Sequence, residues 1–171
     1  SVEDLRQENF ADLVRSGQSM MWRAGELIHL NSCYAPTVDD ELIPEHPIAA
    51  FENGHQHQVP LLIGTNSDEA SFGKFLFQRQ SSRERAALRL LASFDPQHAP
   101  EVVAAYNGAV AREDFAHLLA DALFWAPSTR IATAHAQVAP TWMYRFDFAS
   151  AVLKWLGLGA MHSMELGNVF G

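Results

Sequence analysis

The sequence has little cysteine: Cys33 is the single one among 171 residues. One cysteine cannot form a disulfide within the chain, and no Cys-x-x-Cys pair is present that could begin a structural zinc site. A disulfide-stabilised secreted domain is therefore not expected, and we predict a reducing compartment, the cytoplasm. The first residues also lack a basic segment followed by an apolar core, so no signal peptide is expected.

Positive charge is scarce as well. Twelve Lys and Arg residues stand against twenty Asp and Glu, which gives a formal net charge of −8. Nucleic-acid binding depends on clustered cations, so no nucleic-acid partner is expected. One local basic group, which we interpret as a solvated helix face, consists of Arg79, Arg83, Arg85 and Arg89. The apolar stretch 149–161 contains Lys154 and falls short of the roughly 20 residues of a membrane span, so no membrane partner is expected.

Charged residues are few altogether, at 19% of the chain, whereas apolar residues make up 48%. The apolar fraction is ordinary for a globular domain and excludes disorder, but the charged fraction is low. The chain has the length of one domain and carries more apolar surface than such a domain usually buries alone. A missing segment or partner would account for this composition.

Hydrophobic patterning predicts an α/β fold. Residues 59–65 form an uninterrupted apolar run, typical of a strand buried on both faces, and residues 141–148 indicate a second strand. Helical patterns lie at residues 1–15, 48–53, 69–77, 82–93, 100–107 and 112–138. Gly17 is the expected stop of the first helix, and residues 149–160 are interpreted as a glycine-punctuated loop. A strand, several helices and another strand, in this order, favour a parallel sheet.

Polar residues follow both predicted strands, where the sites of such sheets usually lie. Asp68 and Glu69 follow the first strand, and His162 follows the second. An acid and then a histidine, each beyond a strand, is the order of the last two members of a Ser…Asp/Glu…His hydrolase triad. Taken singly, Glu69 could instead be an acid at a helix N-terminus, and His162 an ordinary hydrogen-bonded histidine.

No pattern for a cofactor accompanies these residues. The sequence has no Gly-x-x-x-x-Gly-Lys-Ser/Thr loop for phosphate, and Gly157 and Gly159 lack the third glycine of a dinucleotide loop. His55 and His57 could present two imidazoles to a metal, but nothing nearby completes the ligand set, so we interpret them as part of a surface loop. We expect neither a metal nor an organic cofactor.

Three groups of residues occur in order along the chain. They are VDDELIPEHP and VPLLIGTNSDEASF (residues 38–47 and 59–72), DALFWAP and YRFD (121–127 and 144–147), and GAMHSMEL and VFG (159–166 and 169–171). Together they resemble the type-B carboxylesterases, cholinesterase-like α/β-hydrolases that include the para-nitrobenzyl esterases. The resemblance implies that Glu69 is the triad acid and His162 the triad histidine. It also places Phe72 at a position that often lines the substrate gorge, although a plain core phenylalanine is equally open there.

The sequence departs from the family pattern in two places next to these residues. Ala70 stands where glycine usually follows the triad acid, and Ser163 stands where glycine is common after the histidine. Neither residue adopts positive φ as freely as glycine does. Both are small, so we expect the changes to affect fine geometry rather than the assignment of the triad.

The family's Gly-x-Ser-x-Gly nucleophile elbow and its glycine-rich oxyanion loop do not occur in the 171 residues. Ser19 has glycine on one side only and lies in a helical pattern, so it does not qualify. We therefore expect residues 1–171 to be a fragment of a single α/β-hydrolase catalytic domain, with a partial fold. The expected partners are the missing N-terminal part of the same enzyme, a small-molecule carboxylic ester and, through uncovered strands, a second copy of the fragment.

The resemblance implies a serine carboxylesterase whose fragment is inactive alone. A non-catalytic adhesion module is the alternative, because some cholinesterase-like proteins have decayed triads. Retention of Glu69 and His162 favours the enzyme, and so does the lone Cys33, since adhesion members are typically rich in disulfides. An α/β domain of unrelated function would require the three ordered matches to be a coincidence.

Overall fold

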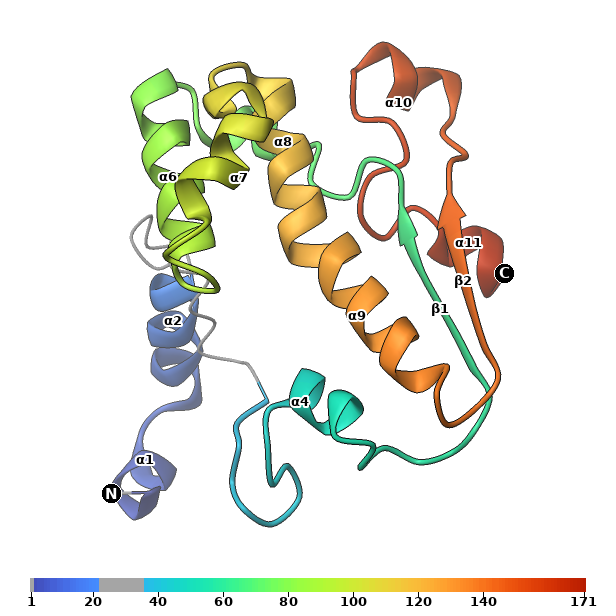
Figure 1. Ribbon diagram of the computed structural model, residues 1–171. Coiled ribbons are helices and arrows are strands. Elements are labelled where there is room, and N and C mark those ends of the chain that lie inside the picture. The colour runs from blue at the N-terminus through green and yellow to red at the C-terminus, as the bar shows by residue number, and fades with distance from the viewer. Residues whose placement is uncertain (1, 22–35) are drawn as a thin grey trace.

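A two-stranded parallel sheet organises the chain (Figure 1). In the computed structural model, which describes residues 2–21 and 36–171, strand β1 (Leu61–Asn66) pairs with strand β2 (Thr141–Phe146). Their register sets Leu61 opposite Thr141 and Asn66 opposite Phe146, so both strands end at the same edge. The predicted strands and their parallel pairing are confirmed, and the loops that follow both strands leave the sheet side by side.

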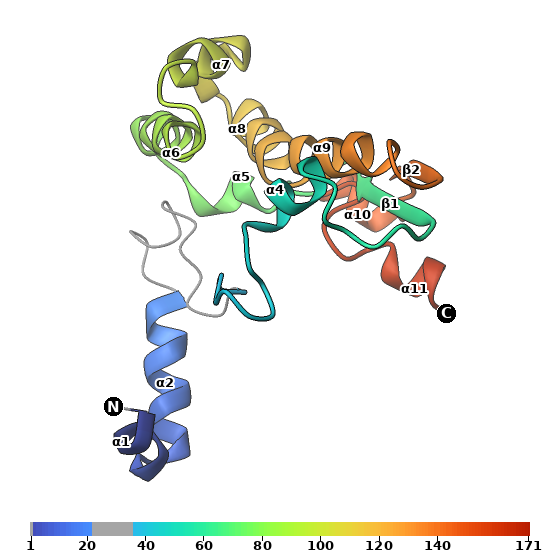
Figure 2. The same ribbon diagram turned by 60° about the horizontal axis from the view of Figure 1, so that its bottom comes forward.

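One face of the sheet packs against a long helical stretch. Helix α8 (Arg112–Ala120) continues through η2 (Asp121–Trp125), a π-helical turn, into α9 (Ala126–His135), which contacts both strands. The predicted helix 112–138 is thus confirmed except for its last residues and the π-helical turn. Figure 2 shows α9 on one side of the strands, with α11 (Leu166–Val169) on the other.

The opposite face of the sheet is largely uncovered. Leu62 and Trp142 lie opposite each other on it and are 69% and 57% exposed. Gly64 lies beneath the ring of Tyr144 on the same face, where a Cβ would come within 2.3 Å of that ring. The prediction that the first strand is buried on both faces is therefore wrong for this chain as it stands, because no helix of the described residues covers Leu62.

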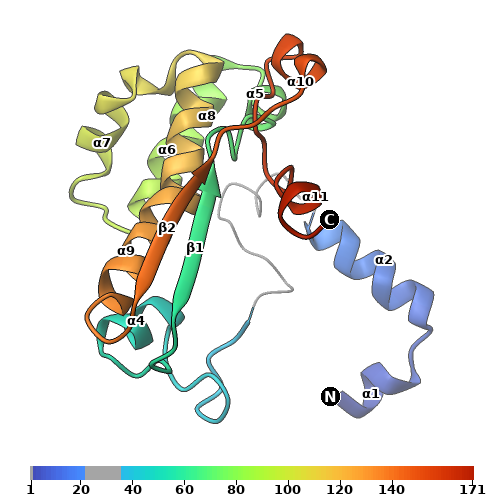
Figure 3. The same ribbon diagram turned by 90° about the vertical axis from the view of Figure 1, so that its right-hand side faces the viewer.

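The chain before the sheet contains two separate helices instead of the single predicted one. Helix α1 (Val2–Gln7) ends before Asn9, whose Oδ1 accepts a hydrogen bond from the Ala11 N–H at 2.9 Å. Helix α2 (Phe10–Met21) then runs through Gly17, so the predicted stop there is wrong. In Figure 3 both helices lie apart from the sheet. Cys33 lies outside the described residues.

The connection from α4 to the site is short. Helix α4 (Pro47–Glu52) confirms the prediction at 48–53, and the chain reverses after it at Gly54, with φ of +77°. After β1, residues 67–72 form turns and helix α5 spans only Gly73–Leu76, so the predicted helix 69–77 is mostly wrong. The turns matter for the site, because they hold Glu69 at the edge of the sheet.

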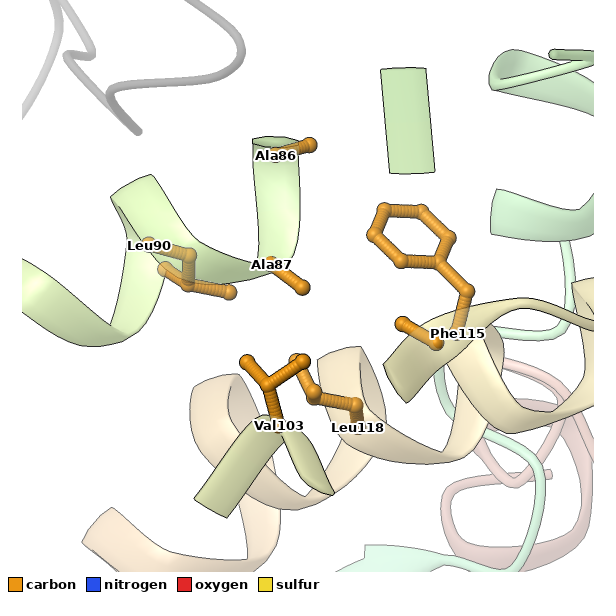
Figure 4. Close-up of a cluster of buried hydrophobic side chains, with 7 residues drawn as sticks. Ala86, Ala87, Leu90, Val103, Phe115 and Leu118 are labelled. Atoms are coloured by element: carbon orange, nitrogen blue, oxygen red, sulfur yellow. The ribbon is translucent and has the colours of Figure 1, made fainter. Parts of the chain in front are cut away.

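The hydrophobic core lies among helices rather than in the sheet. Helices α6 (Gln80–Ala92), α7 (Ala99–Ala105) and α8, with the turn η1 (Asn107–Ala109), confirm the helices predicted there. Their buried side chains meet around Leu90, Val103, Phe115 and Leu118 (Figure 4). Arg83 is also buried and donates to the carbonyls of Phe77, Gln78 and Val110. A solvated helix face therefore describes only Arg85 and Arg89, since the exposed Arg79 precedes α6.

Two short helices follow the second strand, and the first of them lies within the predicted loop. Helix α10 (Ala151–Trp155) begins at Ser150, whose side chain accepts from the Leu153 N–H at 3.3 Å, and α11 follows the histidine segment. The prediction of a loop over 149–160 is wrong for α10. Within residues 2–21 and 36–171, no helix combines the length and the apolar character that crossing a membrane requires.

Candidate active site

Glu69 and His162 meet at the carboxyl edge of the sheet. The Nδ1 atom of His162 lies 2.8 Å from Oε2 of Glu69, and the His162 N–H donates to the Glu69 carbonyl at 3.3 Å. The Glu69 side chain is buried, at 8% exposure, whereas the His162 side chain is 53% exposed. The structure thus brings together the two residues that the sequence singled out.

The other oxygen of Glu69 is occupied too. Its Oε1 accepts the backbone N–H of Asn66 at 2.8 Å, so the carboxylate is fixed on both sides. An ionised carboxylate can only accept, so in the neutral imidazole Nδ1 of His162 donates and Nε2 carries the lone pair. That tautomer leaves a proton acceptor on the exposed side of the ring, which is the arrangement that a general base needs.

Two side chains beside Glu69 hold the histidine segment. The Nδ2 group of Asn66 donates to the Met161 carbonyl at 2.9 Å and to Oε2 of Glu165 at 2.5 Å. Asp68 accepts the Ala160 N–H at its Oδ2 at 3.1 Å and donates its own N–H to the Ala160 carbonyl. Residues before and after His162 in the chain are therefore hydrogen-bonded to Asn66 and Asp68, and these contacts set the position of His162.

Gly159 allows the histidine segment to approach the Asp68 carboxylate this closely. Its φ is +60°, and a Cβ on it would lie 2.3 Å from Oδ2 of Asp68. A side chain there would push the segment off the first-strand loop. Gly159 is thus needed here for space and for backbone conformation together.

The two departures from glycine have different structural settings. Ser163 adopts φ of +68°, whereas the fully buried Ala70 is not among the described residues with positive φ. A non-glycine residue in the left-handed region carries a steric cost, but alanine in an ordinary conformation does not. The sequence could flag both positions but could not tell them apart.

Ser163→Gly is expected to stabilise the protein by up to about 1 kcal/mol, because it relieves the left-handed backbone at this position. Ala70→Gly is the matched control and is expected to lower the free energy of unfolding by about 1–2 kcal/mol, since it adds backbone freedom to the unfolded state and removes a buried methyl group. Urea unfolding of the three proteins measures both. Equal signs for the two changes would show that Ser163 is not strained.

The helical stretch supplies the wall next to Glu69. A cleft of about 290 Å³ is lined by Glu69, Asp121, Trp125 and Arg145 among others. Phe124, from the same π-helical turn, packs its ring against the imidazole of His162, with centroids 4.9 Å apart. The Asp121 carboxylate accepts the Tyr106 hydroxyl at 2.5 Å, and burial with this bond raises the pKa of Tyr106 to about 12.

Phe72 and Ser19, two other residues considered from the sequence, do not line this cleft. Phe72 is 38% exposed. Ser19 lies in α2, where its hydroxyl donates to the Ser16 carbonyl. Asn66 and Phe124 were not singled out from the sequence, although both fall inside the matched motifs, and that position was the signal available for finding them.

One of the two histidines considered as metal ligands, His55, contacts a carboxylate instead. The Nδ1 atom of His55 contacts Oε1 of Glu45, and this hydrogen bond holds the pKa of the Glu45 carboxyl below its usual range. Across residues 2–21 and 36–171, no three His, Cys, Asp or Glu side chains are arranged to hold a metal ion.

Comparison with known proteins identifies the family to which this chain is similar. The profile described as the carboxylesterase family matches residues 1–171. Para-nitrobenzyl esterase of Bacillus subtilis (strain 168) is 34% identical over 141 residues, which cover 81% of this chain and 27% of the relative. Pyrethroid hydrolase Ces2a of Mus musculus is 26% identical over 168 residues, covering 85% of this chain and 30% of the relative. The chain thus spans less than a third of the length of these two relatives.

Solved structures give the same picture. One structure of PNB esterase superposes with a TM-score of 0.77 at 30% identity and covers 99% of this chain and 34% of its own. A second PNB esterase structure gives a TM-score of 0.75 at 28% identity, with 99% and 36% covered. Nearly all of the chain therefore matches about a third of a larger fold.

Proposed function

The chain belongs to the carboxylesterase family, and from that premise we propose that it supplies the acid and the histidine of a serine esterase. Its architecture is part of the α/β-hydrolase fold. The observation that carries the proposal is the contact of 2.8 Å between Nδ1 of His162 and Oε2 of a buried Glu69, beyond the ends of two adjacent parallel strands.

The proposed reaction is acyl transfer to a serine outside residues 1–171. Nε2 of His162 takes the serine proton as the oxygen attacks the ester carbonyl, and later returns it to the departing alkoxide. Glu69 fixes the tautomer of His162 and stabilises the imidazolium that forms. Backbone N–H groups near the serine would hold the oxyanion, which is usually the largest single electrostatic contribution.

The same proposal describes residues 1–171 as one portion of a single catalytic domain. In the described residues β1 pairs with β2 alone, and the face bearing Leu62 and Trp142 is uncovered. A parallel sheet is normally covered on both faces. We infer that the portion of the enzyme bearing the serine pairs with a free edge of the sheet and covers this face.

The chain alone is expected to hydrolyse para-nitrophenyl acetate no faster than free imidazole at the same concentration, because it offers a base without a serine beside it. Adding the serine-bearing N-terminal portion of the parent protein should restore turnover that a fluorophosphonate abolishes. Fluorophosphonate-sensitive turnover by the pure chain would place the nucleophile within residues 1–171 and overturn the proposal.

The chain alone is also expected to associate with itself. Exposed apolar side chains on an open sheet favour pairing with another chain. Leu62→Lys with Trp142→Lys should shift the protein toward the monomer in light scattering, while Leu88→Lys, an exposed position on α6, should not. If residues 1–171 without substitutions were monomeric, or if the double variant and Leu88→Lys had equal effects, the sheet face would be excluded as the contact.

The substrate that we propose is a small-molecule carboxylic ester, with Phe72, exposed outside the cleft beside Glu69, as one wall of a binding space that the serine-bearing portion would complete. The names of the relatives, para-nitrobenzyl esterase and pyrethroid hydrolase, support an ester. We propose the cytoplasm as its location, since Cys33 is the single cysteine of the chain. Phe72→Ala in the full-length polypeptide should raise KM, whereas an unchanged KM would exclude Phe72 from the binding space.

A non-catalytic binding module of the same family is the second candidate. Its discriminating feature lies in the coding sequence upstream of these residues. A serine within Gly-x-Ser-x-Gly supports the esterase, whereas glycine or alanine at that position supports a binding role. The intact contact between Glu69 and His162 favours the esterase, since a decayed site has no need of it.

A further inference from the structure

We propose that Phe124 is a positioning residue that fixes the ring plane of His162 through the contact between their two rings. This inference rests on the proposed function, because it takes His162 as the triad histidine. The contact itself is independent of that role: the two ring centroids lie 4.9 Å apart with an angle of 42° between the planes.

His162 needs such a contact. Glu69 holds only its Nδ1 atom, and the side chain is 53% exposed. A ring held by one hydrogen bond can still swing about that bond, which moves Nε2 away from the serine. An aromatic face on its flank removes that freedom, and it also attracts the imidazolium once the ring is charged.

The π-helical turn explains why Phe124 reaches the imidazole. The Ala126 N–H donates to the Asp121 carbonyl, five residues back, instead of four. Pro127 has no N–H to donate, and its ring would crowd the Leu123 carbonyl in a regular α-helix, so a widened turn is favoured here. The extra residue turns Phe124 by about 100° relative to α9.

The first and last residues of the turn, Asp121 and Trp125, are both held by hydrogen bonds. The Asp121 carboxylate accepts the Tyr106 hydroxyl at 2.5 Å, and the Trp125 carbonyl accepts the Thr129 hydroxyl at 2.8 Å. Phe124 is itself partly buried. The hydrogen bonds of the turn therefore fix the backbone that carries Phe124. Its contact with His162 is for this reason better defined than that of an exposed phenylalanine on a loop.

Nuclear magnetic resonance of the chain itself tests the contact. The wild-type protein should show cross-relaxation between the ring protons of Phe124 and those of His162, with the His162 protons shifted upfield by the ring current. Phe124→Leu should lose that upfield shift and Phe124→Tyr should keep it. Phe94→Leu, at an exposed position after α6, is the matched control and should leave His162 unchanged.

The full-length polypeptide gives the second measurement. Phe124→Leu should lower kcat roughly 2- to 10-fold at unchanged KM, and Phe124→Tyr should restore it. Absence of cross-relaxation in the wild-type chain, or equal kcat in all variants, would overturn the proposal. Lack of esterase activity in a wild-type polypeptide that still shows the ring contact would instead overturn the proposed function.

Discussion

His162→Ala is expected to lower kcat for para-nitrophenyl acetate by about 10⁴- to 10⁶-fold in the full-length polypeptide. The change removes the half-exposed imidazole that contacts the buried acid, so the serine would attack without this base. Another histidine–carboxylate pair, His98 with Asp95, is the matched control. Nδ1 of His98 lies 2.7 Å from Oδ2 of Asp95, but both side chains are exposed.

His98→Ala should leave kcat unchanged within error. The two pairs have nearly the same length, so the comparison isolates the burial of the acid and its place beyond the strand. Steady-state kinetics of the two variants and the wild type measure this. A similar loss in both variants would indicate damage to the fold, and an active His162→Ala enzyme would exclude His162 as the base.

Glu69→Gln is expected to lower kcat by up to about 10⁴-fold, because the imidazolium loses the charge that stabilises it. The geometry adds a second reason. Glu69 accepts one hydrogen bond at each oxygen, from the Asn66 N–H and from His162 Nδ1. Glutamine has a single acceptor oxygen, so one of these donors loses its partner or the histidine adopts the wrong tautomer.

Asp68→Asn is the matched control and should cost up to about tenfold, the scale of one hydrogen bond. Asp68 holds the Ala160 N–H and does not touch the imidazole, and the amide oxygen of asparagine can still accept that bond. Kinetics of both variants with para-nitrophenyl acetate decide the matter. A larger loss of kcat for Asp68→Asn than for Glu69→Gln would indicate that Asp68, and not Glu69, is the triad acid.

The strands and the acid–histidine pair could be predicted because short-range patterns encode them. An apolar run predicts a strand whichever other strand it pairs with. Parallel strands then place the residues that follow them at one edge of the sheet. Glu69 and His162 are 93 positions apart, yet they meet because β1 and β2 are adjacent. The resemblance to a family selected these two from among the other polar residues after the strands.

Elements that depend on tertiary contacts could not be predicted. A helix starting at Glu69 suits the local sequence, but the carboxylate is drawn to His162 and the Asn66 N–H, and turns replace the helix. The π-helical turn depends on Pro127 within a long helical pattern, and its widening is not visible in apolar spacing. Arg83 is buried because three carbonyls from outside α6 receive its guanidinium.

Covalent labelling of the full-length polypeptide with a fluorophosphonate, followed by peptide mass spectrometry, tests most directly whether Glu69 and His162 serve a serine nucleophile. The label should lie on one serine within Gly-x-Ser-x-Gly, outside residues 1–171, and should be lost in His162→Ala but kept in His98→Ala. A label on any serine within residues 1–171, or labelling that persists without His162, would contradict the assignment of this chain as the acid–histidine portion of a serine esterase.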